Sequence, residues 1–301
     1  MGVIVEAAAS AEFLAGLRWG GIAAAIGLIV GVVWRRRLGE PAPVMGIAAV
    51  VAAATALAVV RPLNPSLLAG LFLLAGAGAI FPWTCRVPAL PFLAALPGAW
   101  LIAGSGIPGP GWAIPLAAVV TAVAGPVVSW FDRRANPSAL PSLLFAISAA
   151  GVWVTVPDTE EALVLLGALT APVLLAWPLR VARLGAVGGH LLVALYMWVV
   201  VWGGRGREGS IVGAVAAVGM LIAAPMGAWI PRRPLVITTG WFGIVLIALH
   251  FLVVAVTTRV GGLRDTAADA GAVAIPTVIA AMLVWVAVEA LGPRPDRGEL
   301  S

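Results

Sequence analysis

The sequence predicts an all-α polytopic transmembrane helix bundle with about ten or eleven membrane-spanning helices. Hydrophobic residues make up 62% of the 301 residues and charged residues only 10%, whereas a soluble domain carries about 25% charged residues. Apolar runs recur along the chain at the length of roughly 20 residues that a helix needs to cross a bilayer core of about 30 Å. The mean hydropathy of +1.08 agrees with this class. We expect a single integral membrane domain over residues 1–301.

The apolar runs define about eleven candidate spans under the length criterion. They lie approximately at 13–34, 44–60, 66–83, 87–104, 112–130, 139–156, 162–177, 186–202, 211–230, 235–257 and 272–291. Two halves are possible, 1–136 and 137–301, which would permit an inverted repeat of the kind found in many transporters. Residues 292–301 are expected to form a short cytoplasmic tail.

Local signals predict how some of these helices begin and pack. Asn64 precedes Pro65, and asparagine is a favoured N-cap residue, whereas proline is favoured in the first helical turn. Gly27 and Gly31 lie one turn apart inside the first span. Small residues at this spacing let two helices approach closely, so this pair predicts a packing surface.

The segment 87–104 is the weakest candidate span. Pro88, Pro91 and Pro97 interrupt it, and each proline lacks the N–H that would continue the helical hydrogen bonds. In lipid the freed carbonyl groups need other partners. The segment is therefore expected either to cross as a kinked helix or to re-enter the side from which it came. In the second case the number of spans becomes about ten, and the loops that follow change side.

Arginine bias in the short loops predicts the orientation of the chain. Alternate loops, beginning with the one that holds Arg35, Arg36 and Arg37, carry about twelve of the 18 basic residues, and the opposite loops carry about six. Basic residues are retained on the cytoplasmic side. We therefore expect an outside N-terminus, a cytoplasmic C-terminus, and these three arginines as topology anchors at the end of the first span.

Three ionisable residues are candidates for a substrate or proton pathway. His250 lies about seven residues, or roughly 10 Å, inside the span 235–257, and an ionisable residue at that depth is a functional-site hypothesis by default. The alternative is a neutral histidine that hydrogen-bonds to a neighbouring helix. Glu289 lies near the cytoplasmic end of the last span, either at a pathway mouth or paired with an arginine at the interface. His190 lies near the start of the span 186–202 and is expected at the membrane interface.

Asp132 and Arg133 are candidates in a loop predicted to be cytoplasmic. Their Asp-Arg step resembles the short loop motif of major-facilitator transporters, although the upstream glycine, Gly125, is out of register and the downstream glycine is missing. The alternative is a local topology anchor.

The predicted spans contain no signature of a catalytic or metal centre. They hold no paired carboxylates, no Gly-rich phosphate loop and no nucleophile elbow. Two histidines and the single Cys85 do not supply a zinc ligand set. We therefore predict no catalytic residue, no metal site and no cofactor.

Two resemblances concern the chain as a membrane protein. The segment 156–163, with the sequence VPDTEEAL, resembles a stretch in uncharacterised multi-pass membrane proteins of actinobacteria. It covers one loop and its flanks, and it implies no activity. In length and span number the chain is also similar to drug/metabolite transporters with two five-helix halves, a likeness of architecture alone.

Three classes of function stay open, in this order: a small-molecule or lipid transporter, a non-catalytic scaffold or subunit, and a membrane-embedded enzyme acting on lipid-linked substrates. The expected partners are the lipid bilayer, a transported small molecule or lipid, and a membrane protein partner. A net charge of +5 spread over short loops does not indicate nucleic acid. The bias toward Ala, Gly, Val and Arg is typical of a GC-rich genome and predicts a bacterial cell membrane.

Overall fold

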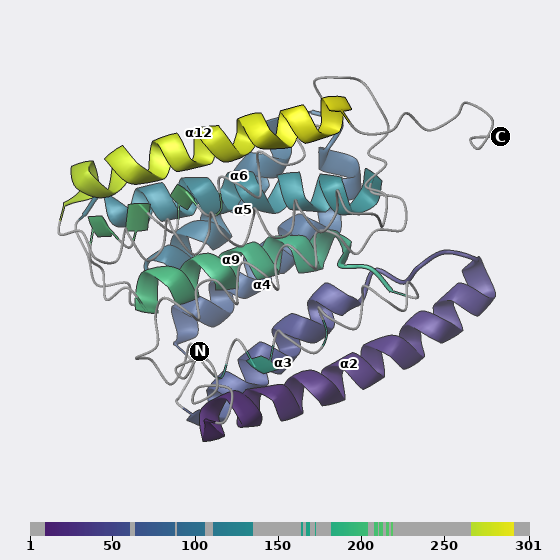
Figure 1. Ribbon diagram of the computed structural model, residues 1–301. Helices are drawn as coiled ribbons and strands as arrows, with labels where there is room; N and C mark the ends of the chain where they lie inside the picture. The colour runs from purple at the N-terminus through teal and green to yellow at the C-terminus, as the bar shows by residue number, and fades with distance from the viewer. Residues whose placement is uncertain are drawn as a thin grey trace.

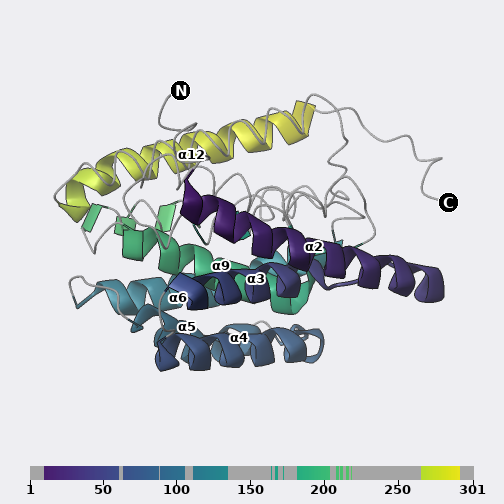
Figure 2. The same ribbon diagram turned by 90° about the horizontal axis from the view of Figure 1, so that it is seen from below.

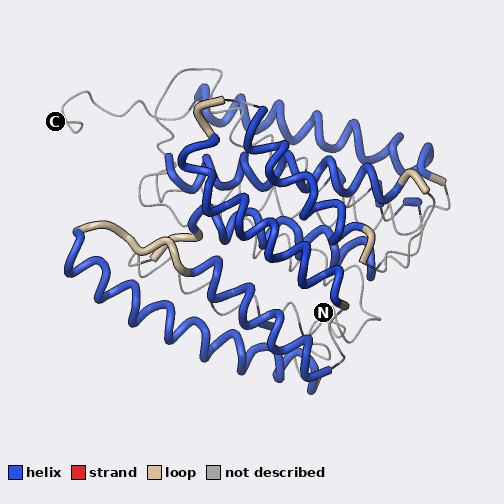
Figure 3. Tube along the Cα trace, turned by 180° about the vertical axis from the view of Figure 1, so that it is seen from behind, coloured by secondary structure: helices blue, strands red, loops and turns tan. Residues whose placement is uncertain are grey.

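A computed structural model describes most of the first half of the chain and parts of the second. The described ranges are 10–60, 64–87, 89–105, 111–134, 182–203 and 266–291, with a few further residues between 164 and 218. Within these ranges the chain is all-helical, as predicted, and no strand is present (Figures 1 and 3). The helices are α2 (Ala11–Leu38), α3 (Met45–Val60), α4 (Pro65–Thr84), α5 (Ala89–Ala103), α6 (Ala113–Arg134), α9 (Gly185–Gly203) and α12 (Ala267–Leu291).

Each of these helices coincides with a predicted span to within a few residues. The matching predictions are 13–34, 44–60, 66–83, 87–104, 112–130, 186–202 and 272–291. The predictions 139–156 and 235–257 lie outside the described residues, and only scattered helical residues are described in 162–177 and 211–230.

Four of the described helices are long and apolar enough to cross a membrane. These stretches are Ala11–Leu38, Pro65–Thr84, Ala113–Trp130 and Ala267–Val284. The helices α3, α5 and α9 are apolar but offer shorter stretches. The chain therefore has the helices of a membrane protein.

Within the proline-rich segment 87–104, the residues Ala89–Ala103 form the helix α5. Pro91 falls in its first turn, where a backbone N–H has no partner inside the helix in any case, so only Pro97 interrupts the interior. The helix is 15 residues long, or about 22 Å, which is shorter than a bilayer core of about 30 Å. It packs between α4 and α6.

Helix α2 buries its small residues and exposes its large ones. The buried residues recur every three or four positions along one face: Gly16, Gly20, Ala24, Gly27 and Gly31. The exposed face carries large aliphatic residues, among them Ile22, Ile26, Ile29 and Val33. A water-soluble helix shows the opposite pattern, whereas a helix in lipid packs through small residues and turns large apolar side chains to the acyl chains.

The predicted packing surface on α2 is confirmed at Gly27. A Cβ atom added there would lie 2.8 Å from Sδ of Met45, the first residue of α3. The two helices form a pair along one edge of the bundle in Figure 1.

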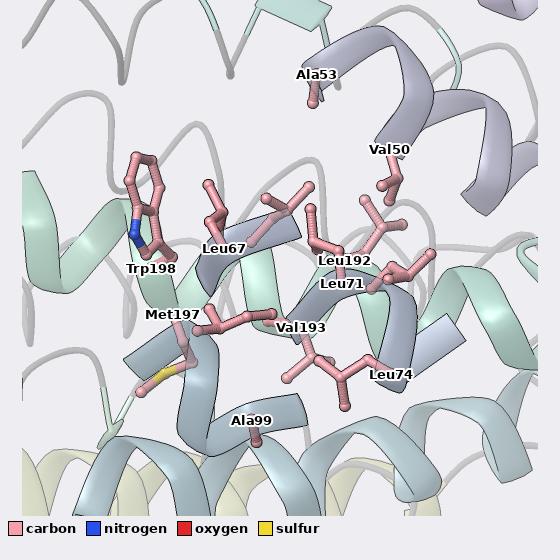
Figure 4. Packing of buried hydrophobic residues seen from close by; sticks show 14 of the residues in the cluster. Val50, Ala53, Leu67, Leu71, Leu74, Ala99, Leu192, Val193, Met197 and Trp198 are labelled. Carbon is pink, nitrogen blue, oxygen red and sulfur yellow. The ribbon is translucent and has the colours of Figure 1, made fainter. Parts of the chain in front are cut away.

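Helix α9 lies in the middle of the bundle. It packs against α3, α4 and α6, and Figure 2 shows it between α12 at one edge and α4 and α5 at the other. Leu67, Leu71 and Leu74 of α4 lie beside Leu192 and Val193 of α9 in an apolar cluster (Figure 4). Helix α9 belongs to the predicted half 137–301 and packs directly on three helices of the predicted half 1–136. The division into two halves stays a prediction.

The loop after α2 lies against the segment before α9. Gly39, with φ 75°, ends α2 in the left-handed conformation that glycine adopts without strain. Beyond it, Arg183 N donates to Ala42 O at 2.7 Å, and Met45 N donates to Arg183 O at 3.1 Å. The run Arg35-Arg36-Arg37 occupies the last turn of α2, where positive charge is favourable at the negative end of the helix dipole.

Helix α12 begins five residues before the predicted span, at Ala267. Thr266 Oγ1 accepts from Asp269 N at 3.2 Å, which satisfies a free N–H group at the helix start, and it donates to Asp269 Oδ2 at 2.8 Å. Glu208 accepts from Ala267 N at 3.0 Å. These polar contacts extend the helix beyond the apolar stretch from which the span was predicted.

The predicted cap at the start of α4 is confirmed. Asn64 Oδ1 accepts from Ser66 N at 2.9 Å, Pro65 follows in the first turn, and Asn64 Nδ2 donates to Ser105 O at 3.2 Å. One side chain therefore caps α4 and ties it to the end of α5.

We expect Asn64→Ala to lower the free energy of unfolding by about 1 kcal/mol, the usual value of an N-cap, as measured by thermal unfolding in detergent. Asn64→Asp keeps the acceptor for Ser66 N but loses the donor to Ser105 O. It should therefore recover most of the loss. An Asn64→Asp protein as unstable as Asn64→Ala would show that the tie to α5, and not the cap, carries the effect.

Candidate functional site: a buried serine and histidine

The candidate site forms where a glycine-rich turn of α9 meets three other helices. The turn has the sequence GAVGGH over residues 185–190. Gly188 lies directly on Gly46 of α3, and a Cβ atom added at Gly189 would lie 2.8 Å from Ser129 Oγ of α6. Glycine contributes from the facing side as well, since a Cβ atom at Gly78 of α4 would lie 2.6 Å from the backbone of α9. The absence of side chains brings these backbones together and encloses the next residue, His190.

His190 is buried at the junction of α4, α6 and α9. Its side chain is 1% exposed. The Nδ1 atom lies 2.9 Å from Ser129 Oγ and 2.8 Å from the carbonyl oxygen of Ala186. The ring of Phe81 meets the imidazole edge to face, with centroids 5.7 Å apart and planes at 65°. The imidazole is thus enclosed by helices, whereas the depth predicted for His190, at the membrane interface, stays a prediction.

These distances assign the proton of the neutral imidazole to Nδ1. An unprotonated Nδ1 would direct its lone pair at the Ala186 oxygen 2.8 Å away, which is repulsive, whereas a protonated Nδ1 donates a hydrogen bond to it. Ser129 Oγ then donates to Gly125 O at 2.7 Å and keeps its lone pairs turned toward the imidazole. Every polar atom around Nδ1 is satisfied in this arrangement.

The second ring nitrogen, Nε2, is left without a partner. It is a buried atom with no hydrogen-bond partner among the described residues. In the neutral ring with the proton on Nδ1, this atom carries a free lone pair. Leaving such an acceptor unsatisfied inside a protein costs about 1–3 kcal/mol. An unsatisfied buried atom in an otherwise bonded cluster calls for an explanation, and a functional role is one.

Helix α6 is adapted to the histidine by two adjacent residues. A Cβ atom at Gly125 would lie 3.0 Å from His190 Cδ2, so a side chain there would press on the ring. Pro126 follows within the helix. Because proline has no N–H, the carbonyl of Ala122, four residues earlier, loses its helical donor.

The other predicted site residues lie elsewhere. Asp132 and Arg133 fall in the last turn of α6, which continues to Arg134, so the prediction that they lie in a loop is wrong. Arginine is favourable at a helix C-terminus, which explains the longer helix. Glu289 lies in α12, but its side chain is outside the described residues, as is all of His250.

The sequence reading missed Ser129, Phe81 and the part played by Gly125. The available signal was the glycine-rich turn before His190 together with the Gly125-Pro126 step before Ser129. In the described ranges no group of three or more His, Cys, Asp or Glu residues could hold a metal ion.

The fold and site together define a helical bundle with membrane-spanning character and a buried serine–histidine pair. No family model matches the chain. A search of curated proteins also finds no significant similarity.

Proposed function

We propose that this chain is a multi-pass protein of a bacterial cell membrane that moves a small molecule or a lipid across the bilayer. The observation that carries the proposal is the unpartnered Nε2 of His190 at the meeting point of three helices. Polar groups within membrane helices are costly, and they commonly mark substrate and ion pathways. Pro126 beside the site supports the same function, because it leaves the Ala122 carbonyl of the continuous helix α6 without its helical donor and so adds a second polar group to this part of the core.

The proposed orientation has an outside N-terminus and a cytoplasmic C-terminus. The loop after α2 and the segment before α9 share hydrogen bonds at Ala42 and Arg183, so both lie at one end of the bundle. That contact supports an even number of crossings between them, as the arginine alternation predicts. The arginine run in the last turn of α2 supports the cytoplasmic side for this end.

A non-catalytic membrane subunit is the second candidate. The described core favours it, because the buried cluster consists almost wholly of Ala, Leu, Val and other apolar residues in close contact. Such packing gives a stable platform for a partner protein without a pathway through it. No described group of side chains favours the third hypothesis, an enzyme acting on lipid-linked substrates.

A transport assay with two unbiased probes tests the first candidate. Purified protein in liposomes is given a ¹³C-labelled polar metabolite extract outside, with uptake read by mass spectrometry. Parallel vesicles contain fluorescent phospholipids, whose exposure is read by dithionite quenching. We expect wild-type protein to move one of these probes severalfold faster than protein-free vesicles do, and His190→Asn to abolish the gain, because Asn keeps a donor near Nδ1 and lacks Nε2.

Thr277→Val is the matched control. Thr277 bonds to Val273 O within α12 at 2.7 Å, so its loss removes a similar polar contact away from the site, and flux should be unchanged. Wild-type protein that moves neither probe would show the transporter proposal to be wrong. A partner that co-purifies in fixed ratio from native membranes would then favour the subunit.

A further inference from the structure

The lone pair on Nε2 can accept only a hydrogen-bond donor or a proton. The tautomer that the Ala186 carbonyl imposes makes this nitrogen a base in the neutral ring. A carboxylate or phosphate oxygen would face a lone pair and be repelled. The ligand at this atom is therefore a donor, and anions are excluded as its direct partner.

The packing favours a proton over a larger donor. His190 is 1% exposed, and a single Cβ atom at Gly125 would already lie 3.0 Å from its ring. The ring of Phe81 covers it from α4. A proton needs no cavity of its own, whereas an amine or a hydroxyl compound would require these helices to separate.

The protein offers a place for the hydrogen that protonation adds. Pro126 deprives the Ala122 carbonyl of its helical donor. Ala122, Gly125 and Ser129 lie three and four positions apart, and hence on one face of α6. The same face meets His190 through Gly125 and Ser129. The freed carbonyl therefore belongs to the face of α6 that meets the ring, and it is the acceptor that we assign to Nε2–H after protonation.

No charged group competes with His190 for the proton inside these helices. The sequences of α3, α4 and α5 contain no ionisable residue. In α6 the ionisable residues are Asp132, Arg133 and Arg134, all in its last turn, and α9 adds only Tyr196. Tyrosine and arginine do not titrate near neutral pH. A neutral imidazole has one unprotonated ring nitrogen, so His190 is the residue of these five helices that can take up a proton within the core.

We propose that His190 Nε2 is the proton-binding site that couples transport to the proton gradient, an inference that rests on the proposed function. The lone pair of Nε2 takes a proton from water on one side of the membrane, and the neutral imidazole becomes an imidazolium ion. Nδ1–H stays bonded to Ala186 O, and we expect Nε2–H to turn toward the Ala122 carbonyl. Release of that proton to the other side restores the neutral ring.

Nitrogen NMR of ¹⁵N-histidine protein in liposomes tests the site itself. The chain has two histidines, so His250→Asn leaves His190 as the only reporter. If that variant does not fold, the difference between wild type and His190→Asn isolates the same signal. We expect an unprotonated Nε2 and a protonated Nδ1 at high pH, and protons on both as the pH falls. A proton on Nε2 at high pH, or a ring that stays neutral wherever the protein is folded, would overturn the proposal.

Proton movement tests the coupling. Vesicles loaded with a pH-sensitive dye report proton flux while the transported ¹³C or lipid probe is followed in parallel. We expect an imposed pH gradient to drive wild-type transport together with proton entry. His190→Asn should lose both transport and proton entry. Pro126→Ala restores a donor to the Ala122 carbonyl, so it should slow transport and proton entry while keeping the neutral tautomer.

Wild-type transport that does not respond to the pH gradient and moves no protons overturns the coupling but leaves the transporter proposal intact. Wild-type protein that transports nothing overturns both.

Discussion

Replacing Gly188 with alanine should separate α3 from α9 and cost about 3 kcal/mol or more, the upper end for overpacking a core. An added Cβ atom would fall on Gly46 Cα and lie 3.0 Å from Gly46 C. Both obstacles are backbone atoms, which cannot rotate away as a side chain can. The helices must move apart, and the contacts of α9 with α4 and α6 depend on the position of α9.

The matched control is Gly76→Ala in α4, where nothing lies within 4 Å of the added Cβ atom. Alanine is the better helix former by about 0.5–1 kcal/mol, so this change should leave stability equal or slightly higher. Thermal unfolding in detergent, with size-exclusion profiles, distinguishes the two variants. Gly46→Ala should behave like Gly188→Ala because it meets the same contact from the other side. Equal melting temperatures for Gly188→Ala and Gly76→Ala would refute the close approach of α3 and α9.

The helices themselves could be predicted because an apolar run of about 20 residues has few alternatives in a membrane chain. Their ends were less predictable wherever polar residues continue a helix. The apolar criterion stopped α6 near Trp130, although Asp132 and Arg133 extend it. It placed the start of α12 at residue 272, although Thr266 already caps the helix through Asp269 N. Hydropathy indicates which residues can lie in lipid, whereas capping residues determine where the hydrogen bonds of a helix begin and end.

Helix pairing was not predictable in the same way. All apolar faces attract one another about equally in lipid, so pairing depends on close fit between small residues. Glycines occur throughout the chain, 36 in all, and only their three-dimensional matching shows that Gly46 meets Gly188. The two are 142 positions apart, a separation that spacing within one helix cannot bridge.

The candidate site likewise has a part that could be predicted from the sequence and a part that could not. Histidine could be selected from the sequence because it is rare in membrane helices and costly there. Depth along a span then favoured His250, which lies about seven residues inside the predicted span 235–257, over His190, which lies four residues after the start of the predicted span 186–202. What encloses His190 is supplied by other helices: Ser129 from α6 and Phe81 from α4. Burial of a residue by neighbouring helices depends on how the bundle is assembled, so it cannot be predicted from the sequence of one span.

Replacing His190 with leucine should abolish transport and leave the protein at least as stable as wild type. Leucine is apolar and forms helices well, and it removes the unsatisfied Nε2, a change worth about 1–2 kcal/mol within the usual range for such an atom. Ser129 keeps its bond to Gly125 O at 2.7 Å. Ala186 O keeps the helical donor from the backbone of residue 190. Nothing else is left unbonded by the change.

A purely structural histidine would behave differently, since its bonds to Ser129 and Ala186 would then hold α6 against α9. In that case His190→Leu should melt well below wild type, and Ser129→Ala should lose part of the same energy. A double-mutant cycle separates the two roles, because residues in one stabilising network are not additive. We expect little coupling in unfolding free energy between the two substitutions, together with loss of flux in His190→Leu. If His190→Leu raises stability but abolishes flux, the role of His190 is functional and not structural. Such a trade-off between stability and activity is common at functional sites.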